Sequence, residues 1–124
     1  MSFSFTQISK VHMLKIDSLW VSEVNRTIIQ QFDELINEGF KNFIIELKSA
    51  PYGQQSATTH NNFLTSTGLS FLISLLTRAR NADGDVVLCS ISESTRQLLV
   101  ITKLNKTFNV FDDLESAIGH FENN

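Results

Sequence analysis

Short strand-like segments alternate with helical patterns along this chain, and the alternation restricts the fold more than any other feature of the sequence. Residues 43–47 and 86–91 are nearly continuous apolar runs, which are typical of strands buried in a sheet. Residues 3–8 and 11–16 alternate apolar and polar side chains, as half-buried strands do. Apolar residues recur at helical spacing in the segments 21–38, 67–81, 93–104 and 112–121, and residues 108–111 predict a last short strand. The predicted order is therefore β, β, α, β, α, β, α, β, α.

This order favours an α/β fold with a mostly parallel central sheet of about five strands, in which right-handed crossovers place four helices against the sheet. The first two strands are joined by a short turn near Ser9 and Lys10, so we expect the N-terminal strand to pair antiparallel at one side. The 124 residues, of which 42% are hydrophobic, can bury a core without metals or disulfides. We predict a single domain over residues 1–124, with a long loop at about 49–62.

Specific residues mark the ends of the predicted helices. Gly39 stands where a left-handed C-cap is wanted after the first helix, and Gly84 follows Asp83 in a turn after the second. Asp112, with Glu115 three residues later, matches the capping-box pattern at the start of the last helix. For the third helix, the expected N-cap is Ser92 and the expected inner side comprises Leu98, Leu99, Ile101 and Thr102.

Charge and cysteine content exclude several classes of protein. The net charge of −3 is made of interspersed charges, and without a basic stripe we expect no nucleic-acid partner. Cys89 is the single cysteine, so no disulfide forms within one chain, and in its apolar run the thiol is expected to be buried. No apolar run approaches the roughly 20 residues of a membrane span, and no signal-peptide pattern opens the sequence, so we expect no membrane association and a cytoplasmic protein.

Three hydroxyl side chains, on Thr65, Ser66 and Thr67, stand where an extended segment turns into an apolar helix. The first N–H groups of a helix have no intrahelical partner, and the helix dipole leaves partial positive charge there. A phosphate on Ser66 would therefore be stabilised. The alternative is that Ser66 or Thr65 only caps the helix.

Two further segments are candidate contact surfaces. The polar stretch 50–62 contains Tyr52 and His60 and lacks periodicity, so it is either a functional loop beside Ser66 or a tolerated insertion. Trp20 precedes the first helix, where it is either a hydrophobic staple or core residue, or an exposed interface anchor.

The sequence does not favour an enzyme. Ser66 with His60 is the nearest approach to a nucleophile and base, but the Gly-x-Ser-x-Gly elbow and the glycine-rich phosphate loops are missing. No Cys or His pair has metal-ligand spacing, and we expect no cofactor. The three histidines, His12, His60 and His120, are expected to be solvated or to have their hydrogen bonds satisfied.

Several local motifs, in their order and spacing, resemble the STAS domain, the family of the bacterial anti-sigma factor antagonists. Residues 63–69 (FLTSTGL) match the family's hydrophobic-Asp-Ser-Ser/Thr-Gly-Leu segment, with Thr65 in place of the Asp. Ala82-Asp83-Gly84 precedes a strand, and residues 97–104 (QLLVITKL) are followed by Phe108 and by residues 115–118 (ESAI). The resemblance covers nearly the whole chain.

The resemblance implies a protein-binding switch in signalling and transcription regulation. Ser66 would be the phosphoacceptor, with Thr67 as second choice, and the partners would be an anti-sigma factor that is a serine kinase and a phosphatase that resets the switch. The implied docking face comprises Trp20, Tyr52, His60, Thr65, Ser66, Thr67 and Gly68. The alternative is a STAS scaffold or small-molecule sensory module without phosphorylation, and exposed sheet edges would permit a homodimer.

Overall fold

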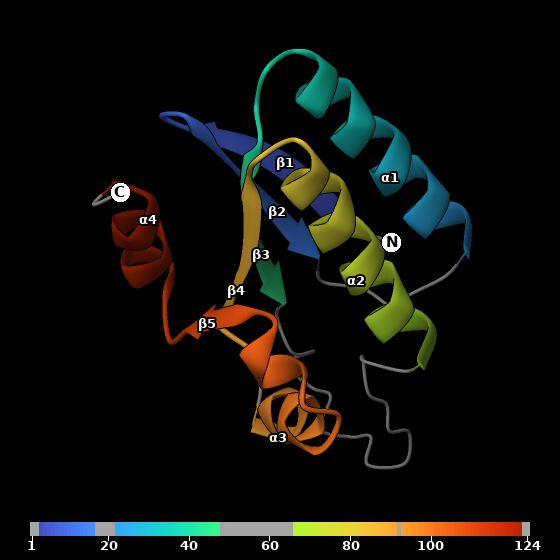
Figure 1. Ribbon diagram of the computed structural model, residues 1–124, viewed down its shortest axis with the longest axis vertical. Helices are drawn as coiled ribbons and strands as arrows, with labels where there is room; N and C mark the ends of the chain where they lie inside the picture. Colours follow the sequence, from blue (N-terminus) through green and yellow to red (C-terminus); the bar gives the residue numbers. More distant parts are fainter. Residues whose placement is uncertain (1–2, 17–21, 48–65, 92, 123–124) are drawn as a thin grey trace.

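The computed structural model describes residues 3–16, 22–47, 66–91 and 93–122, in which five strands form one sheet in the order β1-β2-β3-β4-β5 (Figure 1). The strands are β1 (Phe3–Ile8), β2 (Val11–Ile16), β3 (Asn42–Leu47), β4 (Asp85–Cys89) and β5 (Asn109–Phe111). The helices are α1 (Ser22–Asn37), α2 (Ser66–Asn81), α3 (Glu93–Ile101) and α4 (Leu114–Glu122), with the 3-10 helix η2 (Leu104–Lys106) after α3. The predicted α/β fold, its element order and its helix count are confirmed.

The sheet combines one antiparallel pair with parallel neighbours. β1 and β2 form the predicted hairpin, with Phe3 opposite Ile16 and Ile8 opposite Val11. Ser9, in the turn between them, has a left-handed φ of 60°. β2, β3, β4 and β5 are each parallel to the next, so their carboxyl ends gather at one edge of the sheet.

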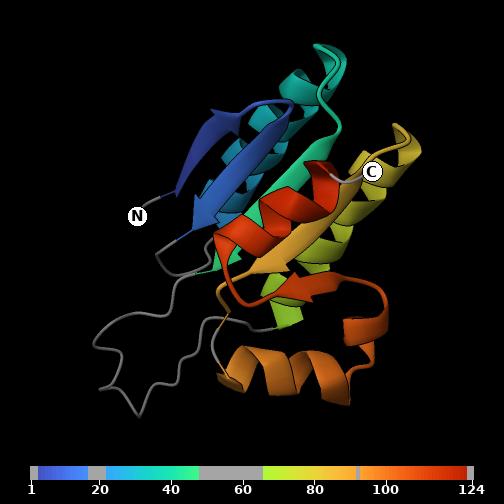
Figure 2. The ribbon, with the colours of Figure 1, turned by 90° about the vertical axis from the view of Figure 1, so that its left-hand side faces the viewer.

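Helices cover both faces of the sheet. α1 and α2 lie on one face, and α4 lies on the other, against β3, β4 and β5 (Figures 1 and 2). Between the sheet and α1, the rings of Phe32 and Phe43 are stacked, with centroids 4.0 Å apart and no exposed surface on either residue. The second, smaller core under α4 consists of Val11, Ile44, Val87, Cys89 and Ala117.

Gly39 takes the left-handed position after α1, as the sequence predicts. Gly39 has a φ of 106°, and its N–H donates to the carbonyl of Ile36 at 3.0 Å. The N–H of Phe40 donates to the carbonyl of Leu35, also at 3.0 Å. These two bonds form a Schellman motif, which satisfies carbonyls that the helix leaves open.

α2 ends with the same pair of bonds, but here a non-glycine residue takes the left-handed position. Asp83 has a φ of 68° and donates from its N–H to Arg80 O at 3.0 Å, and Gly84 donates to Ala79 O at 2.8 Å. Gly84 is needed for space: a Cβ at this position would overlap the carbonyl group of Lys41. The predicted turn is confirmed, with the glycine serving a close approach between two chain segments.

Three predicted boundaries are wrong. The cap of α4 is Asp113, whose carboxylate accepts the N–H of Ser116 at 2.8 Å, and Asp112 instead pairs with Arg96 at 3.2 Å. β4 ends at Cys89, because Ser90 takes a left-handed φ of 57°. α3 ends at Ile101, and Lys103 has a left-handed φ of 65° before η2. Ser92, the predicted cap of α3, lies outside the described residues.

Candidate functional site

The carboxyl edge of the sheet brings the start of α2 and the whole of α3 to the same end of the molecule (Figures 1 and 2). α2 connects β3 to its parallel neighbour β4, so it must run back along the sheet from the carboxyl end of β3 to the amino end of β4. α3 and η2 make the connection from β4 to β5 across the same edge. Open sheets of this kind hold their sites at this edge.

Ser66, the predicted phosphoacceptor, is the first residue of α2, and Thr67 and Gly68 continue the helix. The first turn of α2 carries no acidic residue, whereas its last turn carries Arg78 and Arg80. The first turn of α2 therefore has no carboxylate of its own to repel an anion, and the two arginines complement the negative end of the helix dipole. The other predicted docking residues, Trp20, Tyr52, His60 and Thr65, lie outside the described residues, as does the loop at 49–62.

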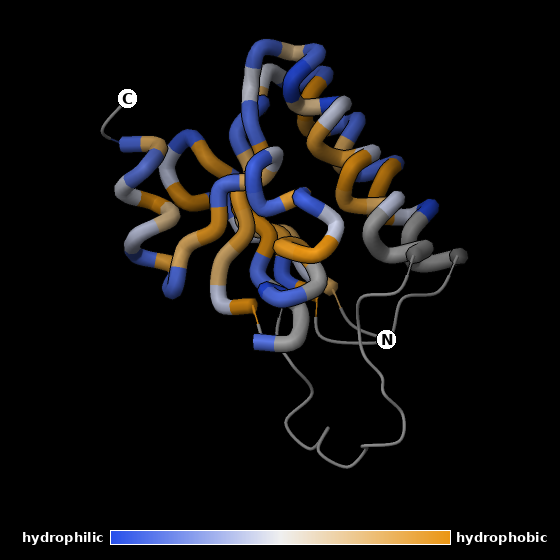
Figure 3. Tube along the Cα trace, turned by 60° about the horizontal axis from the view of Figure 1, so that its bottom comes forward, coloured by the Kyte–Doolittle hydropathy of each residue, from blue (hydrophilic) through white to orange (hydrophobic). Residues whose placement is uncertain are grey.

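α3 presents an apolar surface at this end of the molecule. Val100 is 54% exposed and Ile101 is 76% exposed, which is more than any other large hydrophobic side chain among those described. Lys103, between α3 and η2, and Lys106, the last residue of η2, are both exposed. Figure 3 turns this end towards the reader and shows the apolar stretch of α3 flanked by hydrophilic segments. Val100 and Ile101 thus form a small exposed apolar surface with two cations near it in the chain.

The exposure of Ile101 corrects the prediction that it lies on the inner side of α3. Leu99 is fully buried, as predicted, whereas Thr102 is also exposed. The sequence carried a signal for this: the run 98–101 (LLVI) occupies four successive helical positions, and these point in directions around the whole helix. A helix that packs on one side must then expose some of them.

The segment that carries Val100 and Ile101 is anchored to the main core by its neighbours in the chain. Leu99 and Phe108 belong to the main core, and Leu104 packs partly against it. The N–H of Thr107 donates to the carbonyl of Leu104 at 2.9 Å, which closes η2. The Arg96 to Asp112 pair also joins α3 to the segment before α4, but Asp112 is 91% exposed, so solvent screens this pair strongly.

The cysteine at this edge is poorly suited to act as a nucleophile. Cys89 is buried at the end of β4, and burial raises the pKa of its thiol to about 11, so the thiolate is scarce at neutral pH. No group of three or more His, Cys, Asp or Glu in the described part of the chain is placed to hold a metal. Within the same residues, no helix has the length and apolar character needed to cross a bilayer.

One predicted histidine environment is wrong, and it lies at the other end of the sheet. His12 is only 6% exposed, and its Nδ1 has no hydrogen-bond partner within the described residues. The sequence pattern did not reveal this, because the alternation treats His12 as a polar, outward position, whereas in β2 it shares the parity of buried Leu14 and Ile16. His120, by contrast, lies near the rings of Phe111 and Phe121, at centroid distances of 5.3 and 5.0 Å.

Comparison with known proteins identifies the family of this fold and of the motif at the start of α2. A model of the STAS domain family matches residues 3–117. The chain belongs to the STAS domain family. The resemblance that the sequence motifs carry is therefore confirmed.

Solved structures agree with this family. An anti-sigma factor antagonist from Mycobacterium paratuberculosis matches 96% of this STAS domain and 92% of its own chain, with a TM-score of 0.73 and 17% identity. SpoIIAA in its unphosphorylated form matches 99% of this chain and 98% of its own, with a TM-score of 0.73 and 12% identity. Bacillus SpoIIAA in the phosphorylated form matches 97% and 99%, with a TM-score of 0.69 and 13% identity. These likenesses show a shared fold. No curated protein matches the sequence.

Proposed function

We propose that this STAS domain is an anti-sigma factor antagonist that binds a serine kinase anti-sigma factor and releases it when Ser66 is phosphorylated. The observation that carries the proposal is the position of Ser66 as the first residue of α2, at the carboxyl edge of the sheet, in a first turn without acidic residues. The similar solved structures support it, because they include proteins named as antagonists and both the phosphorylated and unphosphorylated forms of SpoIIAA.

Phosphorylation would proceed by ordinary transfer from ATP. The Ser66 hydroxyl oxygen attacks the γ-phosphorus, the bond from that phosphorus to the oxygen bridging it to the β-phosphorus breaks, and ADP leaves. The hydroxyl proton passes to a base of the kinase. A phosphatase would restore the hydroxyl by transferring the phosphoryl group to water. Thr65 stands where the family has an aspartate, so the kinase would have to accept Ser66 without that neighbouring carboxylate.

The charge of the phosphate supplies the switch. In the free protein, a group carrying about −1.5 to −2 charges at the start of α2 meets the positive end of the helix dipole. In a complex, the same group would have to lose its hydration inside a packed interface, which is costly without a cationic partner. Phosphorylation thus favours the free protein, and the unphosphorylated form binds.

α3 would supply much of the contact area. Val100 and Ile101 expose apolar surface that a partner can cover, and Lys103 and Lys106 favour a partner with acidic residues around that contact. An anti-sigma factor that contacts both α3 and the start of α2 would sense the Ser66 phosphate directly.

Intact-mass spectrometry tests the phosphorylation. The protein is incubated with ATP, magnesium and the anti-sigma kinase encoded nearest to it. We expect the wild type to gain one phosphate and the Ser66→Ala variant to gain none. Ser70→Ala is the matched control, because Ser70 is exposed on the next turn of α2. Thr67→Ala tests whether Thr67, the second candidate, is the acceptor in place of Ser66. A phosphate gained by Ser66→Ala but lost in Thr67→Ala would move the acceptor to Thr67.

Binding measured by calorimetry against the same kinase tests the switch. Ser66→Glu should bind at least tenfold more weakly than Ser66→Ala, and Ile101→Ser should also weaken binding, while Gln30→Ser on the exposed side of α1 should not. Equal binding by Ser66→Ala and Ser66→Glu, together with no gain of phosphate, would leave a scaffold or sensory module on the same fold.

A further inference from the structure

β1 forms one edge of the sheet, and within the described residues no strand pairs with its outer side (Figure 2). Its six residues pair with β2 without interruption, from Phe3 opposite Ile16 to Ile8 opposite Val11. The strand at the other edge, β5, has only three residues. β1 is therefore the longer of the two edges and the one better able to pair with another strand.

The sequence of β1 lacks the features that usually protect a sheet edge. Its residues (FSFTQI) include no charged side chain and no proline, and the continuous register with β2 contains no β-bulge. Phenylalanine, threonine and isoleucine also favour strands. An unprotected edge of this kind is a template for a further strand.

The turn between β1 and β2 decides which backbone groups of β1 face outward. A two-residue turn joins Ile8 to Val11, so these residues form a hydrogen-bonded pair, and such pairs recur at every second residue. Ser4 and Thr6 therefore bond to β2, whereas the N–H and C=O groups of the alternate residues point away from it. The outward-facing residues are Phe3, Phe5 and Gln7.

A second copy of β1 suits these outward-facing groups. In an antiparallel pair with a two-fold axis at Phe5, Phe3 of each copy lies opposite Gln7 of the other, and the two Phe5 residues lie opposite each other. Every outward-facing residue is then in a hydrogen-bonded pair. An axis at Ser4 would leave Gln7 without a partner in the other β1, and an axis at Thr6 would leave Phe3 without one.

The side chains of β1 also match across an axis at Phe5. Phe3 and Phe5 are partly exposed on the α1 face of the sheet, with their rings edge to face at a centroid distance of 6.2 Å. The two copies of Phe5 would form a cross-strand aromatic pair. On the other face, exposed Ser4 would lie opposite exposed Thr6, and neither carries a charge.

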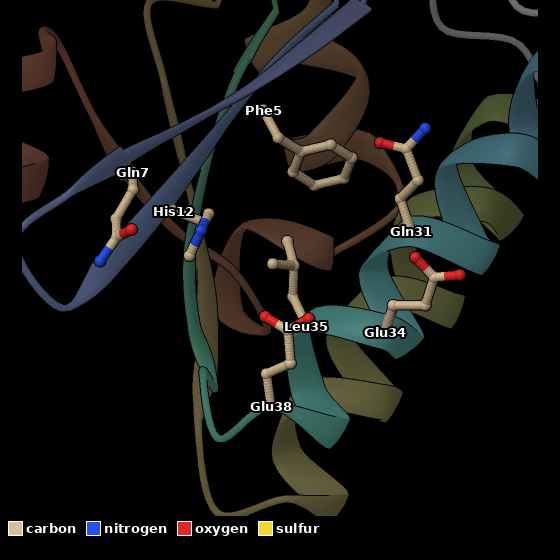
Figure 4. Close-up of a pocket in the computed structure, with 7 residues that line it drawn as sticks. All are labelled: Phe5, Gln7, His12, Gln31, Glu34, Leu35 and Glu38. Carbon is tan, nitrogen blue, oxygen red and sulfur yellow. The ribbon is translucent and has the colours of Figure 1, made fainter.

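The acidic residues at the end of α1 lie towards the Gln7 end of β1. A pocket of about 450 Å³ beside His12 lies between α1 and the strands β1 and β2, and its lining includes Phe5, Gln7, Gln31, Glu34 and Glu38. Figure 4 shows Gln31 near Phe5, and Glu38 further along α1. The helix therefore passes the level of Phe5 near Gln31 and carries its carboxylates beyond that level.

Arg26 lies on α1 on the other side of that level. It precedes Gln30 by four residues, and Glu34 follows Gln30 by four, so the three residues share one exposed stripe of the helix. A two-fold axis near Gln30 places Arg26 of each copy across from Glu34 of the other. Within the described residues, neither Arg26 nor Glu34 forms an ion pair in the single chain. The charges of α1 are therefore complementary to those of a second copy.

We propose that two copies of this chain associate through β1, around a two-fold axis perpendicular to the sheet at Phe5. The two five-stranded sheets become one continuous sheet, and the two α1 helices lie antiparallel on the same face of it. The contact is isologous, so it closes at two chains. No residue of α2 or α3 takes part, and the contact does not depend on phosphorylation of Ser66.

Sedimentation equilibrium from micromolar to millimolar protein, combined with amide hydrogen exchange measured by NMR, tests the proposal. We expect a reversible equilibrium between monomer and dimer, in which exchange at Phe3, Phe5 and Gln7 slows as the dimer forms. A protein that stays monomeric, forms larger assemblies, or dimerises without slower exchange at these residues would overturn the proposal.

Paired substitutions on the exposed face of β1 test the register. Ser4→Glu combined with Thr6→Glu places like charges opposite each other across the axis and should weaken the dimer at least tenfold. Ser4→Glu combined with Thr6→Lys places opposite charges there and should hold the dissociation constant within about threefold of the wild type. Asn109→Glu, an exposed change on the other edge strand, is the matched control and should leave the dimer intact. Equal dimerisation by the two double variants, or an equal loss in Asn109→Glu, would contradict pairing through β1.

A charge exchange on α1 tests the position of the axis. Arg26→Glu should weaken the dimer, and Arg26→Glu combined with Glu34→Arg should restore it, because the exchange keeps opposite charges across the axis. A loss that the second substitution does not repair would overturn this two-fold arrangement. Ser66→Ala should dimerise as the wild type does, which keeps failure of this contact distinct from failure of the proposed switch.

Discussion

Gly84 and Lys41 bring two chain segments together at the amino end of the sheet. The carbonyl of Lys41 accepts the N–H of Asp85 at 3.1 Å, and the missing side chain at Gly84 makes room for that approach. The sequence predicted a turn here, but the need for space depends on a segment more than forty residues earlier, which no local pattern reports.

Gly84→Ala should therefore destabilise the fold by about 1–3 kcal/mol, because the new methyl group overlaps backbone that cannot move freely. Urea unfolding followed by circular dichroism measures this. Gly119→Ala is the matched control: Gly119 lies in α4 with open space around its Cβ position, so alanine should stabilise the protein by about 0.5–1 kcal/mol. Equal effects of the two substitutions would contradict the close approach.

His12 makes stability depend on pH. Burial lowers its pKa below the ordinary 6.5, although the nearby charge of Glu38 acts in the opposite direction. As the pH falls, His12 therefore takes up a proton at a higher pH in the unfolded chain than in the folded chain. The contribution of His12 to stability is complete above pH 6.5 and is lost as the pH falls through the lowered value.

We expect the urea midpoint to fall between about pH 8 and pH 5, and the His12→Phe variant to show a smaller fall. The difference between the two proteins isolates His12 from the other titrating groups. Parallel pH profiles would show that the imidazole titrates alike in the folded and unfolded chains.

At the scale of the elements, Asp113 shows how a helix end is chosen between two adjacent acidic residues. Its carboxylate accepts the N–H of Ser116 at 2.8 Å, and this backbone hydrogen bond, aided by one from the Ser116 side chain, lowers the pKa of Asp113. Asp112 lies one residue too early to reach that N–H and forms an exposed ion pair instead.

Asp113→Ala should lower the melting temperature, because α4 loses its cap, and Asp112→Ala should change it little, because exposed ion pairs contribute little. Differential scanning calorimetry compares the two variants. A larger fall of the melting temperature in Asp112→Ala than in Asp113→Ala would show that Asp112 caps α4, as the sequence pattern predicts.

Element boundaries were predictable where one local rule acts alone. The hairpin strands follow from alternation, and the turn at Gly39 after α1 follows from glycine's access to positive φ. α3 was predicted to continue to residue 104 because its apolar run fits a helix over that length. The structure ends it at Ile101, where Leu104 and Phe108 turn back into the core and Ile101 is left in solvent. Tertiary packing overrides local propensity at that point.

At the scale of the whole molecule, the stack of Phe32 on Phe43 joins α1 to the central strand. Phe43→Ala should cost about 3–5 kcal/mol, a large share of the roughly 5–15 kcal/mol that stabilises a typical domain. Phe43→Leu should cost less, since it retains most of the buried volume.

Urea unfolding again provides the measurement, with Val100→Ala as the control. Val100 is 54% exposed, so its truncation should change stability by no more than about 0.5 kcal/mol. A comparable loss in both alanine variants would mean that α3 packs more tightly than its exposure indicates.

As with the fold, only part of the candidate site was predictable from the sequence. The sequence placed Ser66 at the start of a helix and at the edge of a parallel sheet, since both follow from periodicity and element order. The exposed pair on α3 and the pocket beside His12 were missed, because each depends on how separate elements pack together. Trp20, Tyr52 and His60 lie outside the described residues and stay predictions.

The strand order has a consequence for how the chain is made. Each strand lies beside the strand that precedes it in the sequence, from β1 to β5. During synthesis, every strand that emerges from the ribosome therefore finds its neighbour already outside, and no gap in the sheet waits for a segment still to be translated. The sheet can grow in one direction as the chain lengthens, with only its newest strand lacking a neighbour on the growing side.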